Sequence, residues 1–271
     1  MKLSLIPRQI FLTLVTVAAL APLAFMLVTS VKTPDDYQQH PFGLPTSPTF
    51  ANYVTAIVDL PTLRWAMNSI IVTVLAVAAS GVMGALAAYA ITFGRFRGRE
   101  LLMNGSIGLI MVPPVVLLLP MFVTMVNLHL VNTLGSVILF YACLLVPFSV
   151  FFLTNFFRSV PKELIEASTV DGAGPLRTLW SVVLPISRPA LVTIAVVNAV
   201  WAWNELLIAL VFLQDENQRT LMAGLTLFQG RYVTNQPLLL AVATLSILPV
   251  AVFYLMTQRT FVRGLTSGMG K

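Results

Sequence analysis

The chain has 271 residues, of which 58% are hydrophobic and 10% are charged. Soluble globular domains carry about 45–50% apolar and about 25% charged residues, so this composition excludes an ordinary soluble domain. The net charge of +6 and the pI near 9.8 would suit a nucleic-acid-binding protein. The basic residues, however, lie in short groups between long uncharged stretches. We therefore expect no nucleic-acid partner, because no folded basic domain remains to bind one.

The uncharged stretches predict an all-α polytopic membrane protein. A bilayer core of about 30 Å needs about 20 apolar residues of helix. Within this core, backbone N–H and C=O groups must hydrogen-bond to one another, so a loop cannot cross it. The longest uncharged stretch, 101–157, has room for two spans, divided by polar residues between Asn127 and Ser136. We expect one transmembrane domain over 1–271. Its six spans are predicted near 10–31, 68–93, 102–126, 137–157, 189–213 and 238–258.

Several elements between and within these spans follow in chain order. The first span is too long and lacks a clean cleavage site for a signal peptide, so we expect it to be retained. The proline-rich segment from Lys32 to Met67 predicts irregular structure with a short helix near 52–59. Val112-Pro113-Pro114 predicts a break in the third span. That break fits a flexible helix lining a pathway and a simple packing kink equally well.

The distribution of Lys and Arg predicts the orientation. Twelve of the 16 basic residues lie at the two termini and in the second and fourth loops, and four lie on the other side. Both termini are therefore expected in the cytoplasm, with the lipid bilayer around the spans.

The sequence offers little for catalysis. The single Cys143 excludes an intrachain disulfide and a cysteine metal site. His40 and His129 have no acidic cluster near them in sequence, so we predict no metal site. There is no Walker A phosphate loop, so ATP would be hydrolysed by another subunit. We expect no enzymatic activity in this chain.

The loop 158–188 is far longer than a connection between spans requires. Ser159 or Val160 is expected to cap a helix with Pro161 in its first turn and an end near Val170. Gly172 then suits a left-handed turn, and a second helix starts near Pro175. Leu184-Pro185 is expected to end it. Leu164, Leu176 and Leu179 would fill a groove on another protein or pack against the chain's own spans. The loop itself could rest on lipid or dock a soluble partner.

The loop resembles the "EAA loop" of bacterial ABC-importer permeases. The residues that fit begin with Glu166-Ala167-Ser168. Gly172 follows after three intervening residues, Val182 after nine more, and Leu184-Pro185 after one more. Ser168 replaces an alanine of the family pattern and Val182 an isoleucine. The rest of the chain is similar to MalG-type permeases of carbohydrate importers. The segments that carry this likeness include Asn68-Ser69, Ala87-Ala88-Tyr89-Ala90, Phe96-Arg97-Gly98, Met111-Val112-Pro113, Asn132-Thr133, Phe156-Phe157-Arg158, Ala202-Trp203-Asn204-Glu205, Arg219-Thr220-Leu221 and Phe261-Val262-Arg263-Gly264.

The resemblance implies a type I ABC importer (MetI-like) permease fold in the bacterial plasma (inner) membrane. It also implies a heterodimer with a second, MalF-like permease, an extracytoplasmic solute-binding protein, and two cytoplasmic ATPase subunits that bind ATP and Mg. The solute would be a carbohydrate or a sugar-like molecule. The residues that would couple the permease to the ATPase are Glu166, Ala167, Ser168, Asp171, Gly172, Leu184 and Pro185. The tail residues that would reach the ATPase are Gly264, Leu265, Thr266, Ser267 and Gly268.

Glu205 is the only ionisable residue inside a predicted span, where a charge is costly. With Trp201, Trp203 and Asn204 it would line a path for sugar, or it would make a structural hydrogen bond between the two permeases. The alternative function is an ion-coupled secondary transporter of a small polar solute. A single acid supports that alternative weakly, and it leaves the long loop 158–188 unexplained.

Overall fold

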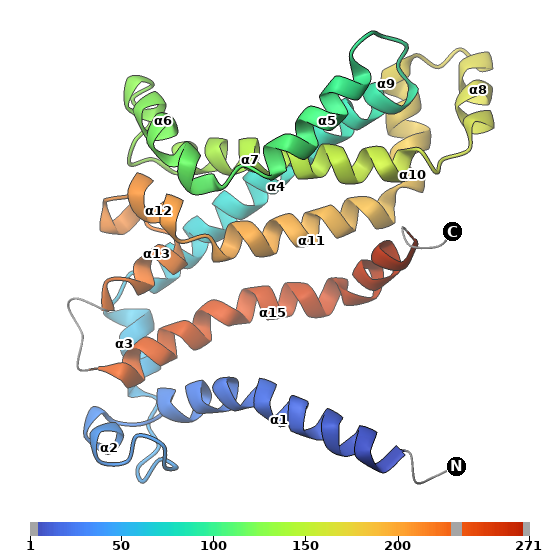
Figure 1. Ribbon diagram of the computed structural model, residues 1–271. Coiled ribbons are helices and arrows are strands. Elements are labelled where there is room, and N and C mark those ends of the chain that lie inside the picture. The colour runs from blue at the N-terminus through green and yellow to red at the C-terminus, as the bar shows by residue number, and fades with distance from the viewer. Residues whose placement is uncertain (1–4, 229–234, 268–271) are drawn as a thin grey trace. The chain divides into compact units, whose positions relative to one another are not determined.

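The computed structural model describes residues 5–228 and 235–267, and side chains within 8–228 and 235–258. These residues form helices and no strand, which confirms the all-α class (Figure 1). The chain divides into two compact units: Met1–Ala66 with Leu221–Pro249, and Met67–Thr220 with Val250–Lys271. The expected single domain over 1–271 stays a prediction.

Among the described residues, four helices are long and apolar enough to cross a membrane, or up to six if each of two bent pairs is one span. The four are α1 (Leu5–Ser30), α4 (Thr62–Phe93), α7 (Leu134–Phe157) and α15 (Gln236–Ser267). The first bent pair, α5 (Arg99–Ile110) and α6 (Pro114–Asn127), meets at 100° where the proline break was predicted. The second joins Pro175–Ile186 to α11 (Arg188–Asn204) at 81°. The predicted fifth span is divided, because α11 ends before a short α12 (Leu207–Phe212).

The first unit holds α1, α2 (Pro34–Gln39), α3 (Ala51–Val58), the start of α4, α13 (Leu221–Leu225) and the first part of α15. Hydrogen bonds from polar side chains hold the segment after α1 in place. Lys32 is fully buried and donates from Nζ to the His40 carbonyl oxygen at 2.6 Å. Asn52 donates to the Ser30 and Lys32 carbonyl oxygens, both at 2.8 Å. The expected helix near 52–59 is present as α3. The segment before it is less irregular than expected, since α2 was not predicted.

In the second unit, α5, α6, α11 and α12 all pack against α7 (Figure 1). The unit also contains the short 3₁₀ helix η2 (Glu216–Gln218). One core cluster joins buried residues of α4, α7, α11 and α12, among them Val72, Phe140, Tyr141 and Phe212. This core holds α11 and α12 in place on either side of Glu205.

A close helix crossing lies further along α4 and α7. A Cβ built on Gly84 would lie 2.5 Å from the Ser149 Cβ, so only glycine fits there. Beyond it, Ala85, Ala88, Leu153 and Phe157 form a second core cluster. This cluster reaches the ends of α4 and α7, where the loop 158–188 begins.

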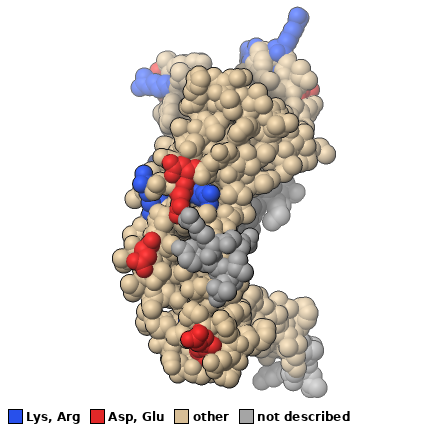
Figure 2. Space-filling model, turned by 90° about the vertical axis from the view of Figure 1, so that its left-hand side faces the viewer, with Lys and Arg blue, Asp and Glu red and all other residues tan. Residues whose placement is uncertain are grey.

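Charged side chains are sparse on the surface. On the face in Figure 2, Lys, Arg, Asp and Glu form a few separate groups, and most of the described surface is uncharged. Leu and Val side chains along α1 and α4 are exposed, including Leu14, Val17 and Val74. Such exposure suits contact with lipid or with another membrane subunit rather than water.

Candidate functional site

The loop 158–188 folds as a helical hairpin. Its first helix is α8 (Lys162–Val170), and Pro161 precedes it at the N-cap position with no side-chain cap. The expectation that Pro161 lies in the first turn was wrong by one residue. Its ψ of 130° is extended, which places it before the first helical residue. The predicted end at Val170 is confirmed.

Backbone hydrogen bonds close the end of α8. The Gly172 N–H donates to the Thr169 carbonyl oxygen, and the Ala173 N–H to that of Ser168, both at 3.0 Å. This is the Schellman pattern, in which the residue after the cap takes a left-handed conformation. Gly172 does so, with a φ of +78°. A Cβ there would meet nothing within 4 Å, so glycine is required by backbone conformation and not by crowding.

The second helix of the hairpin follows a short turn. It comprises α9 (Pro175–Thr178), a π-helical turn η1 (Leu179–Val183) and α10 (Leu184–Ile186). The Ser168 and Thr178 hydroxyls are hydrogen-bonded at 2.8 Å and buried, and they join α8 to α9. Ser168 replaces an alanine of the EAA pattern, and Thr178 supplies the partner that its hydroxyl needs.

The apolar stripe of the hairpin has two destinations. Leu179 and Val183 are buried in the second core cluster, against α4 and α7. Leu176 is 63% exposed, and Leu164 is exposed as well. Packing against the chain's own spans is therefore confirmed for Leu179, whereas filling a groove on another protein stays a prediction for Leu164 and Leu176. The hairpin is anchored to its own spans through Leu179 and offers Leu164 and Leu176 to another surface.

The outer surface of the hairpin is both apolar and acidic. Val170 is 87% exposed and Trp180 59% exposed. Glu166 and Ala167 are exposed on α8. The Glu166 carboxylate makes no hydrogen bond or ion pair within the described part of the chain. An anchored projection with an unpaired carboxylate suits a basic groove on a soluble partner.

The end of the hairpin is a sharp bend. Leu184 and Pro185 lie in α10, and the 81° change of direction falls at Ser187, between Pro185 and Pro189. The Ser187 N–H still donates to the Val183 carbonyl oxygen at 2.9 Å. Pro189 opens the next helix, as predicted. The hairpin is therefore joined to α11 without a flexible linker.

Glu205 lies where α11 ends and α12 begins. Its backbone is extended, with φ −69° and ψ 124°. Its carboxylate accepts hydrogen bonds from the Ile208 N–H at 3.0 Å and the Ala209 N–H at 3.2 Å. The Tyr141 hydroxyl donates to it at 2.6 Å. A carboxylate at this place satisfies free N–H groups of α12 and favours the positive end of the helix.

The other residues of the predicted substrate path differ in position. Trp203 is buried. Trp201 is half-buried and packs edge-on to Tyr141, with ring centroids 5.4 Å apart. Asn204 is exposed, and its side chain donates to the Val200 carbonyl oxygen at 2.7 Å. Asn204 and parts of Trp201 and Glu205 are thus accessible, and a role in binding sugar stays a prediction for all four.

The tail residues predicted to contact the ATPase are only partly described by the structure. Residues Gly264 to Ser267 are the last residues of α15, and Gly268 lies outside the described residues. Contact of this tail with an ATPase stays a prediction.

Two partners of the site residues were missed from the sequence. Tyr141 is 64 residues before Glu205, and no local signal links the two. Thr178 is ten residues after Ser168. The Ser-for-Ala departure at 168 was the signal that could have prompted a search for a buried polar partner on the facing helix.

Comparisons with known proteins identify the family. Residues 80–267, more than half of the chain, match the family described as "Binding-protein-dependent transport system inner membrane component". The chain is 36% identical over 262 residues to a protein of Bacillus subtilis (strain 168) named "Probable ABC transporter permease protein YurM", covering 97% of this chain and 87% of that one. It is 34% identical to the sulfoquinovosyl glycerol transport system permease protein SmoH of Agrobacterium fabrum (strain C58 / ATCC 33970), covering 96% and 92%.

A third relative is the trehalose/maltose transport system permease protein MalG of Thermococcus litoralis (strain ATCC 51850 / DSM 5473 / JCM 8560 / NS-C), with 33% identity, covering 94% of this chain and 92% of that one.

Among solved structures, the chain is similar to a chain of a bacterial ABC transporter involved in the import of the acidic polysaccharide alginate. The TM-score is 0.82 at 26% identity, covering 96% of this chain and 97% of that one. The fold is thus that of type I, MetI-like importer permeases, and the secondary-transporter alternative is set aside. The chain is a multi-pass membrane protein that belongs to the binding-protein-dependent transport inner membrane component family, as a non-enzymatic ABC transporter permease subunit.

Proposed function

We propose that this chain is one half of the membrane pathway of a carbohydrate importer and that the hairpin 158–188 receives the movement of the ATPase. The observation that carries the coupling role is the combination of anchor and exposed surface. Leu179 and Val183 hold the hairpin in the core of the second unit, while Glu166 and Val170 project from it. A partner that moves α8 therefore also moves the ends of α4 and α7.

The assembly around the chain has four further subunits. A second, MalF-like permease completes the pathway, two cytoplasmic ATPases bind ATP and Mg, and an extracytoplasmic protein delivers the solute. The exposed apolar surface of α1 and α4 supports a membrane partner. The excess of basic residues in the loops of one side supports a bacterial inner-membrane location with both termini in the cytoplasm. The tail from Gly264 to Gly268 contacts the ATPases in this assembly.

The solute is a carbohydrate or a sugar-like molecule. The names of the relatives support this class, since they include a sulfoquinovosyl glycerol permease and a trehalose/maltose permease. In the membrane, Asn204 and Glu205 contact the solute near the break between α11 and α12, beside Trp201. Binding of the cognate solute-binding protein to a glycan panel, measured by calorimetry, tests the class. Binding of amino acids or ions in place of every glycan would contradict it.

The coupling role is tested by Glu166→Ala, with Glu163→Ala as the matched control on the same helix. A charge-assisted hydrogen bond contributes about 1.5–3 kcal/mol, so loss of the Glu166 carboxylate should weaken binding of the ATPases at least about tenfold. Insertion of the permease into the membrane should be unchanged, because the Glu166 side chain makes no hydrogen bond or ion pair within the described chain. The measurements are titration of the ATPase onto reconstituted permease and solute-stimulated ATPase activity. Wild-type coupling in Glu166→Ala would exclude the assigned role.

A further inference from the structure

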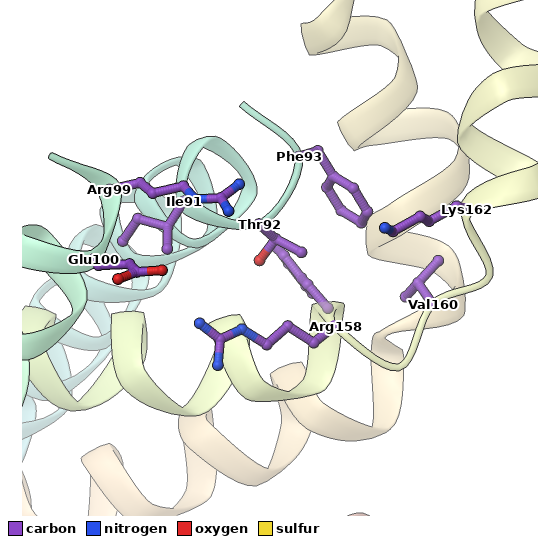
Figure 3. Close-up of a pocket in the computed structure, with 9 residues that line it drawn as sticks. Ile91, Thr92, Phe93, Arg99, Glu100, Arg158, Val160 and Lys162 are labelled. Carbon is purple, nitrogen blue, oxygen red and sulfur yellow. The ribbon is translucent and has the colours of Figure 1, made fainter. Parts of the chain in front are cut away.

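A pocket lies at the start of the hairpin, and none of the roles proposed above involves it. Its volume is about 310 Å³, and it is lined by the end of α4, the start of α5, the end of α7 and the start of α8 (Figure 3). Ligand pockets in proteins begin at about 300 Å³, so this one has room for a small group and not for a large molecule. The lining residues are Ile91, Thr92, Phe93, Arg99, Glu100, Phe157, Arg158, Val160 and Lys162.

Three of the lining residues are cations and one is an acid. Figure 3 shows Arg99 and Lys162 directed toward the same space from opposite sides, with Arg158 along its lower edge. None of these three side chains forms an ion pair or hydrogen bond with another residue in the described ranges. The Glu100 carboxylate also lines the pocket and pairs with none of them there. An excess of unpaired positive charge in a small pocket is suited to an anion.

The position of the pocket indicates where that anion comes from. The candidate spans α4 and α7 end at Phe93 and Phe157, and both residues line the pocket. The polar headgroup layer begins where the apolar part of a span stops. Next to Arg99, Leu101 and Leu102 are 75% and 55% exposed on α5, which suits contact with acyl chains. A pocket lined by cations, with exposed apolar side chains following Glu100 on α5, matches an amphiphilic ligand.

We propose that this pocket binds the phosphate group of an anionic phospholipid of the cytoplasmic leaflet. Basic pockets between transmembrane helices on the cytoplasmic side recognise such headgroups. The bound phosphate connects Arg99 at the start of α5 with Arg158 and Lys162, which flank the entry to the hairpin. The lipid thereby fixes the connection between α7 and α8. This assignment does not depend on the identity of the transported solute.

The test uses the assembled importer in mixtures of phosphatidylglycerol and phosphatidylcholine, with bound lipids counted by native mass spectrometry. Each basic residue near an anionic lipid surface contributes about 1 kcal/mol, which is about fivefold in affinity. The double variant Arg158→Gln with Lys162→Gln should therefore retain phosphatidylglycerol roughly 25-fold more weakly. Arg97→Gln, compared with Arg158→Gln alone, is the matched control, because each variant removes one charge from the predicted cytoplasmic side and Arg97 does not line the pocket. Arg158→Lys keeps the charge and should retain the lipid, which separates a charge effect from misfolding.

Two results would overturn the proposal. One is equal retention of phosphatidylglycerol by the wild type and the double variant. The other is occupation by inorganic phosphate with no preference for phosphatidylglycerol over phosphatidylcholine, which would assign the pocket to a free anion. Selective retention of phosphatidylglycerol that is lost in the double variant and kept in Arg97→Gln and Arg158→Lys would support it.

Discussion

Two places in the second unit end one helix and begin another, and they do so by different means. At Gly172 the chain leaves α8 through backbone hydrogen bonds and a left-handed glycine. At Glu205 it leaves α11 in an extended conformation, and a carboxylate satisfies the first N–H groups of α12. The first turn lies in an exposed loop, where water can reach the remaining polar groups. The second lies in a predicted span, where each unpaired backbone group would be costly. The surroundings thus decide whether a backbone turn suffices or a charged side chain is needed.

The largest expected effect is at Glu205. In Glu205→Ala, the Ile208 and Ala209 N–H groups and the Tyr141 hydroxyl lose their acceptor. Unsatisfied buried groups cost about 1–3 kcal/mol each, so we expect a loss of about 3 kcal/mol in stability. Glu205→Gln keeps one acceptor oxygen and should lose about 1 kcal/mol, chiefly the interaction of the charge with the helix end.

The measurement for Glu205 is the thermal unfolding midpoint of the purified importer, with solute uptake measured in parallel. Asn204→Ala is the control for stability alone, since that side chain is exposed and its hydrogen bond lies within its own helix. Its proposed contact with the solute makes it unsuitable as a control for uptake. If Glu205→Ala and Glu205→Gln unfolded at the same temperature as the wild type, the capping role would be refuted. A large loss of uptake in Glu205→Gln at unchanged stability would favour a role in the solute path.

An intermediate effect is expected at Gly172. A left-handed conformation costs a residue with a Cβ about 1–2 kcal/mol, so Gly172→Ala should loosen the end of α8 and lower coupling of ATPase activity to uptake. Gly172→Asn should be milder, because asparagine accepts this conformation. Gly174→Ala is the control, as its φ of −72° suits any residue and no atom lies within 4 Å of an added Cβ. Equal coupling in Gly172→Ala and Gly174→Ala would contradict the requirement for glycine.

The smallest effect is expected for the buried hydroxyl pair. Ser168→Ala removes one of the two side chains that hydrogen-bond to Thr178, the other being Tyr89, at a cost of about 1 kcal/mol. Hydrogen exchange of the α8 amides should then be about fivefold faster, because local opening becomes easier by that amount. Adding Thr178→Val removes the hydroxyl that has lost its Ser168 partner and should slow the exchange again. Thr169→Ala, whose exposed hydroxyl bonds within α8, is the control. Faster exchange in the double variant than in Ser168→Ala would show that the pair does not act as described.

Features with local signals were predictable from the sequence, and those that depend on distant residues were not. The long uncharged stretches predicted the spans, and Gly172 predicted the end of α8. The helix α2 was missed although Thr33 caps it and Pro34 and Asp35 open it, which is a usual start signal. The break at Glu205 carries no proline or glycine. It depends on the Glu205 carboxylate, which caps α12, and on contacts with Tyr141 that no local signal in the sequence indicates.

The right-angled break between α5 and α6 has a mechanical consequence. A continuous helix transmits an axial displacement from end to end, because its hydrogen-bond ladder is unbroken. Pro113 and Pro114 supply no N–H group, so that ladder stops between Ile110 and Pro114. Since α5 packs along α7, a tilt of α7 carries α5 with it, while α6 has its own contacts with α7 and the core. The interrupted ladder therefore gives no continuous helix along which a tilt of α5 would pass to α6, so the two halves of the bent pair can tilt by different angles.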